Sequence, residues 1–124
     1  MGPEEGGFDL SAAHYQVIGL LPPDLQAAAC QLVRERQLSL RDTRWLVALL
    51  SSQPGISLPV AVAMVEAVAR SPVGSCLARI EAALDELPEP GELTGSERRM
   101  VLVILELLME RAQLLRHALL ALSG

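Results

Sequence analysis

Four arginines lie close together in the first third of the chain: Arg34, Arg36, Arg41 and Arg44. The planar guanidinium group matches the geometry of phosphate, and helix N-termini attract anions. The cluster therefore predicts possible phosphate contacts. Ordinary surface ion pairs are the preferred interpretation, for example Asp42 with Arg41 or Arg44, because Glu35 and Asp42 lie among the arginines and reduce the local charge.

Other residues whose side chains could take part in catalysis are not arranged as a catalytic site. Glu81, Asp85 and Glu86 follow one another on a single helical stretch, and a solvated face is the preferred interpretation because no pocket is indicated. His14 and His117 stand apart from any metal-ligand spacing. The glycines match no phosphate-binding loop. We expect no enzyme activity, and we predict no catalytic, cofactor-binding or metal-binding residues.

Composition favours a helical protein. Apolar residues make up 51% of the 124 residues, while aromatic residues are rare, so the core must be built from aliphatic side chains that suit helix packing. The net charge of −5 disfavours a general nucleic-acid surface. Cys30 and Cys76 are interpreted as buried or half-buried free thiols rather than a disulfide. With no signal-peptide pattern and no apolar run long enough to span a membrane, the expected location is cytoplasmic.

Helix start and stop signals divide the chain into six predicted helices, and the fold class is all-α, a compact bundle with a long apolar C-terminal helix. Prolines open two helices, and Ser39, Ser57, Ser71 and Thr94 stand at predicted N-caps. We predict a flexible N-terminus over residues 1–8 and a single helical domain over 9–124. Within it, five short helices occupy 9–87, a linker 88–93 and the long helix 94–122.

Two of the short helices have predicted inner faces that bear on the packing. The helix over 23–36 is expected to bury an apolar set at helical spacing. The helix that begins near Ser57 is expected to bury a second such set. These residues are Leu25, Ala28, Ala29, Leu32 and Val33 in the first helix, and Val60, Met64, Val65 and Val68 in the second.

The last predicted helix has the most informative pattern. Its apolar residues recur in alternating steps of four and three, the spacing of a coiled-coil seam. A second apolar stripe lies beside this seam, so the helix is predicted to be buried on most of its circumference. This burial could come from self-association, from a partner helix, or from a central position of the helix in a monomer. The seam residues are Val101, Leu105, Leu108, Ala112, Leu115, Leu119 and Leu122.

One stretch resembles a known family. From Leu20 to Gly55 the chain has a Leu-Pro step, a helix, a Leu-Ser turn and a second helix, and Ile56 to Arg70 adds another Leu-Ser start and a Val-rich helix. This order resembles the helical DNA-binding region of ParB/Spo0J-like partition proteins. The resemblance implies a shared helical scaffold and, through the arginine cluster, contacts with DNA phosphate.

The same comparison places the helix from Ser11 to Leu20 in the position of the family's recognition helix. His14 and Gln16 there carry groups that hydrogen-bond to bases. The chain departs from the family pattern in two respects: only one helix precedes Pro22 where the family has two, and this helix contains no Arg or Lys. Both departures weaken the expectation of DNA binding.

The function predicted from the sequence is that of a non-enzymatic helical module for protein–protein interaction or homodimer formation, acting as an adaptor or assembly factor through its last helix. The alternative is a ParB-like DNA-binding or partition accessory protein that contacts phosphate through the arginine cluster. The expected partners are a second copy of the chain or a helix of another protein, and nucleic acid is disfavoured by the acidic charge.

Overall fold

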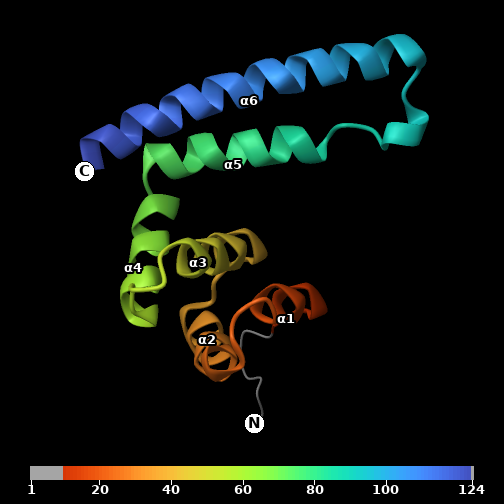
Figure 1. Cartoon of the computed structure of the whole chain (residues 1–124). Helices are drawn as coiled ribbons and strands as arrows, with labels where there is room; N and C mark the ends of the chain where they lie inside the picture. The colour runs from red at the N-terminus through yellow and green to blue at the C-terminus, as the bar shows by residue number, and fades with distance from the viewer. Residues whose placement is uncertain (1–9, 124) are drawn as a thin grey trace. The chain divides into compact units, whose positions relative to one another are not determined.

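The computed structural model describes residues 10–123, and within this range every regular element is helical (Figure 1). The all-α class, the six α-helices and the long C-terminal helix are confirmed. The N-terminus predicted to be flexible, residues 1–8, lies outside the described residues. In chain order the elements are α1 (Ala12–Ile18), α2 (Pro23–Arg36), α3 (Leu40–Ser52), α4 (Leu58–Ala69), α5 (Pro72–Asp85), the 3₁₀ helix η1 (Pro90–Glu92) and α6 (Gly95–Ser123).

Capping residues explain where several helices begin. The Ser39 hydroxyl accepts the backbone N–H of Asp42 at 3.1 Å, which starts α3. Thr94 and Glu97 exchange two hydrogen bonds of 2.9 and 3.1 Å, the reciprocal capping box predicted for α6. Ser57 occupies the N-cap position of α4, but its side chain makes no capping hydrogen bond, contrary to the prediction.

The first helix has a capping box that the sequence patterns did not indicate. Ser11 accepts the backbone N–H of His14, and its own backbone N–H donates to Nδ1 of His14 at 3.2 Å. An imidazole nitrogen that accepts from an N–H carries no proton, so Nε2 holds the proton and donates to the Leu38 carbonyl at 3.2 Å. His14 is therefore a buried structural residue and is not available to contact bases.

By internal contacts the chain divides into two compact units, one ending at Glu81 and the other beginning at Ala82. The boundary falls inside α5, before the linker at residues 88–93. In the first unit, α3 packs against both α4 and α1 and forms its centre (Figure 1). Its buried apolar residues come from α1 to α4 and their connections: Ile18, Leu21, Ala29, Val33, Leu38, Leu46, Val47, Leu50, Leu58, Ala61, Val62 and Val65.

The inner faces of α2 and α4 differ in part from the predictions. On α2, Ala29 and Val33 are buried, whereas Ala28 is exposed. The α4 prediction was largely wrong: Val65 is buried as expected, but the other three members of its predicted set are exposed, and α4 buries Leu58, Ala61 and Val62. This helix is apolar on nearly every side, so its pattern alone does not identify the face that packs.

Between α2 and α3 the chain turns through a left-handed residue. Gln37 has φ 55° and ψ 47°, and the N–H of Leu38 donates to the Val33 carbonyl at 3.0 Å. This hydrogen bond is typical of a Schellman ending, in which the residue after the helix takes a left-handed conformation. The turn brings Leu38 back onto the core, where it is buried.

The second unit consists of the end of α5, η1 and α6. No residue of the 29-residue α6 is buried. The prediction that this helix is buried on most of its circumference was therefore wrong for the single chain. Besides α6, the second unit holds only the last turn of α5 and one short 3₁₀ turn, which are too short to cover a helix about 43 Å long.

Candidate interaction surface

The α6 seam is the row of seven apolar residues that the heptad spacing indicates on the last helix. Of these, Leu108, Leu115, Leu119 and Leu122 have between 50 and 85% of their surface exposed, and Ala112 is exposed as well. Val101 and Leu105 are partly exposed. The seam is therefore accessible along its whole length in the single chain, where a soluble helix ordinarily covers such a face.

Further apolar residues widen this surface. Twelve large apolar residues of α6 are exposed, and eight of them lie outside the seam: Met100, Leu102, Val103, Ile104, Leu107, Met109, Leu114 and Leu120. Monomeric soluble proteins rarely expose a contiguous apolar patch larger than a few hundred Å², and larger patches mark interaction sites. This abundance of exposed apolar side chains is the strongest functional feature in the described part of the chain.

The exposed apolar residues of α5 and the connection after it follow the same spacing, which the sequence reasoning missed. They recur in steps of four and three, as a heptad seam does. They are Val73, Leu77, Ile80, Leu84 and Leu87, each at least 42% exposed. The signal was present in the sequence, but only the structure shows that this row is not used in the core.

The four arginines of the predicted phosphate cluster each have a partner within the chain. Arg34 donates to the Tyr15 hydroxyl at 3.1 Å, and Arg44 lies 3.5 Å from Glu81. Arg41 pairs with Asp42 at 3.2 Å, as the ion-pair interpretation expected, and its guanidinium lies 5.1 Å from the centre of the Trp45 ring.

Arg36 makes the best-formed ion pair of the cluster, with Glu66 on α4. Two of its nitrogens donate to the two carboxylate oxygens, at 2.6 and 3.0 Å, in the two-pronged geometry that guanidinium favours. These hydrogen bonds lower the pKa of Glu66 and raise that of Arg36. The pair links α2 to α4, which gives Arg36 a structural role.

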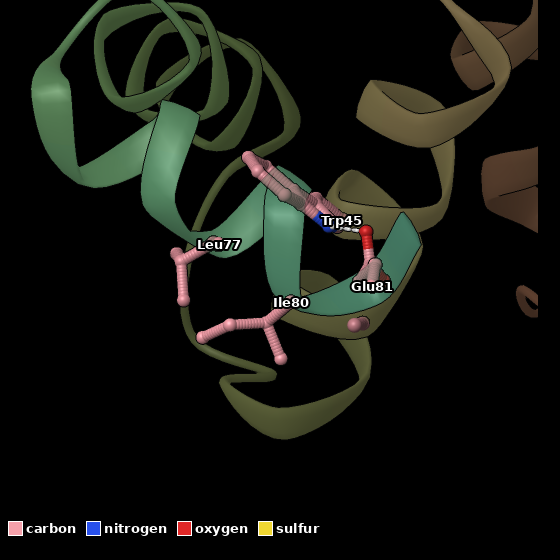
Figure 2. Close-up of a pocket in the computed structure, with 5 residues that line it drawn as sticks. Trp45, Leu77, Ile80 and Glu81 are labelled. Carbon is pink, nitrogen blue, oxygen red and sulfur yellow. Dashed lines mark hydrogen bonds between the residues drawn. The ribbon is translucent and has the colours of Figure 1, made fainter. Parts of the chain in front are cut away.

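A recess of about 290 Å³ lies beside Trp45 on α3, lined by Trp45, Ala48, Leu77, Ile80 and Glu81 (Figure 2). The indole N–H of Trp45 donates to Oε1 of Glu81 at 2.9 Å. The sequence pattern predicted that Glu81 lies on a solvated face with Asp85 and Glu86. Its carboxylate instead contacts Arg44 in addition to Trp45. The recess is open, and its volume is just below the range of about 300–1,000 Å³ that is usual for ligand sites.

No group of three or more potential metal ligands occurs among residues 10–123. The two cysteines are free thiols, and Cys76 is exposed, whereas the sequence predicted that both would be buried or half-buried. No single helix in this range is long and apolar enough to cross a membrane. Only α4 and α5 together pass that test of length and composition, with a bend of 84° at their junction.

Comparison of the chain with family models, with curated proteins and with solved structures finds no match. The resemblance to ParB/Spo0J-like proteins therefore stays a prediction.

Proposed function

We propose that this chain is a non-enzymatic helical module that self-associates through the α6 seam and acts as an adaptor or assembly factor. The observation that carries the proposal is the exposure of a complete heptad seam on a 29-residue helix. Heptad seams exist to pack against another helix, because each seam residue inserts between four residues of its partner. The second unit contains no other long helix to provide those residues.

The exposed apolar area of α6 can be compared with the area that a standard interface buries. Burying one leucine-sized side chain removes roughly 60–120 Å² of apolar surface. The twelve large exposed residues of α6 then present on the order of 700 Å² around the whole helix, and one partner helix covers only the part on the seam side. A standard interface buries about 800 Å² on each partner, so two paired seams form an interface smaller than the standard one.

The alternative function, DNA binding through the arginine cluster, has less support. Each of the four arginines already contacts a hydroxyl, a carboxylate or an aromatic ring of the chain. Phosphate binding would have to compete with these contacts, and the net charge of −5 opposes the approach of DNA. The seven residues of the α6 seam carry no charge, so packing against the seam does not have to compete with ion pairs of the chain.

Oligomeric mass tests the proposal. Leu108→Glu places a charge in the middle of the seam, and Leu120→Glu is the matched control outside the seam, since the two leucines are 50% and 52% exposed. We expect wild type and Leu120→Glu to be dimers or larger by light scattering at micromolar concentrations. Leu108→Glu should be a monomer with unchanged helix content, because Leu108 contributes to no core.

A wild-type chain that is a monomer at all accessible concentrations would overturn self-association. Two variants that both keep the assembled mass of wild type would show that another surface makes the contact. A salt-dependent complex with duplex DNA that is lost in the double variant Arg41→Ala/Arg44→Ala would favour the alternative function.

A further inference from the structure

We propose that the α6 seams of two copies pack antiparallel, related by a twofold axis near Glu110. This inference rests on the proposed function and names the partner surface. In an antiparallel pair, each residue before the centre of the seam faces one after it. A centre near Glu110 places Leu108 opposite Ala112 of the second copy, and Leu105 opposite Leu115 of the second copy.

Side-chain volume favours this orientation. Ala112 is the one small residue in a seam otherwise built of leucine and valine. A parallel pair in register would stack Ala112 on Ala112 of the second copy and leave a void between two leucine layers, which is costly in a packed core. The antiparallel pair instead sets the larger Leu108 against each Ala112, so both central layers are filled. The seam is thus complementary to itself under a twofold rotation.

Charges beside the seam favour the same orientation. By heptad position, Arg111 and Arg116 lie on opposite flanks of the seam. A parallel pair would bring Arg111 of each copy beside Arg116 of the other, which makes two repulsive contacts. The antiparallel pair has one repulsive approach, between the two Arg111 side chains at the centre.

The ends of α6 add a third contribution. Arg98 continues the seam by one step at the N-terminal end and donates to the Pro90 carbonyl at 3.2 Å. A parallel pair in register would place Arg98 opposite Arg98 of the second copy. An antiparallel pair places it beside the C-terminal turn of the other helix, near Leu122, where the helix dipole favours a cation.

Disulfide trapping of the full-length chain tests the orientation. Two variants are made in a background with Cys30→Ala and Cys76→Ala: Leu105→Cys, with a size tag, and Leu115→Cys. In the antiparallel pair the two copies of residue 115 are separated by about ten residues, roughly 15 Å along the axis. A disulfide requires Cα atoms within about 7 Å. Mild oxidation of the mixed variants should therefore give the mixed dimer, while each variant alone should stay unlinked.

Each result decides a different question. Self-linking of either variant alone shows a parallel pair and overturns the orientation, while the proposed function stands. A reduced background chain that is a monomer by light scattering overturns both proposals. A dimer of the expected mass that gives no mixed disulfide overturns the antiparallel pairing centred near Glu110, while the proposed function stands.

Discussion

Trp45 on α3 and Glu81 on α5 are joined by a hydrogen bond of 2.9 Å between the indole Nε1–H and Oε1 of the carboxylate (Figure 2). The same carboxylate oxygen lies 3.5 Å from a guanidinium nitrogen of Arg44, and Arg41 lies over the Trp45 ring. The Glu81 carboxylate thus contacts two residues of α3. Gly74 is the only buried residue of α5, so this polar contact is a principal attachment of the helix to α3.

Trp45→Phe keeps one aromatic ring and removes the five-membered ring that carries the N–H donor. We expect a loss of about 0.5–1.5 kcal/mol in the free energy of unfolding, the usual range for one hydrogen bond. Glu81→Gln should cost less, because the amide oxygen still accepts from Trp45. Urea denaturation measures both. A double-mutant cycle of Trp45→Phe with Glu81→Ala should show coupling between the two sites, and zero coupling would mean that the bond contributes nothing to stability.

The ion pair between Arg36 and Glu66 predicts a pH-dependent stability. Hydrogen bonds from Arg36 lower the pKa of Glu66 in the folded chain. A carboxyl with a lowered folded pKa stabilises the fold above its unfolded pKa, about 4.3 for glutamate, and loses that contribution as the pH falls through the folded value. Wild type should therefore be more stable than Glu66→Gln at pH 6–7, with the difference vanishing in acid.

Urea denaturation at several pH values measures this difference. Arg36→Gln removes the same pair from the other side and should show the same loss of pH dependence. A difference between wild type and Glu66→Gln that is constant from pH 7 to pH 3 would contradict a role for the ionised pair.

Helix boundaries were predicted well because they depend on local signals. The bounds of α2 agree with the prediction, since Pro23 fits the first turn of a helix, and Thr94 with Glu97 marks the beginning of α6. These signals act over three or four residues, and a single sequence shows them directly.

Contacts between distant residues were not predictable in the same way. Trp45 and Glu81 are 36 residues apart, and the imidazole of His14 reaches a carbonyl 24 residues away. No spacing rule joins such residues. Periodicity also shows that a helix has an apolar face but not whether its own chain covers that face, so the exposure of α6 needed the structure.

The junction of α4 and α5 depends on Gly74. The Ser71 hydroxyl accepts the N–H of Gly74 at 3.2 Å and donates to the Val68 carbonyl, which confirms Ser71 as the predicted cap. A Cβ atom at Gly74 would overlap the carbonyl oxygen of Val68 and lie 2.9 Å from Cα of Ala69. Both neighbours are backbone atoms, which cannot rotate away as a side chain can, so only glycine fits without displacing α5.

Gly74→Ala should therefore lower the free energy of unfolding by about 1–3 kcal/mol, the cost of adding a methyl group to a packed site. Gly55→Ala is the matched control, because a Cβ there meets nothing within 4 Å. Removing a glycine at an unstrained position restricts the unfolded chain, so this control should be neutral or slightly more stable than wild type. Urea denaturation followed by circular dichroism compares the three proteins. Equal stability of Gly74→Ala and Gly55→Ala would mean that α5 does not pack closely against the end of α4.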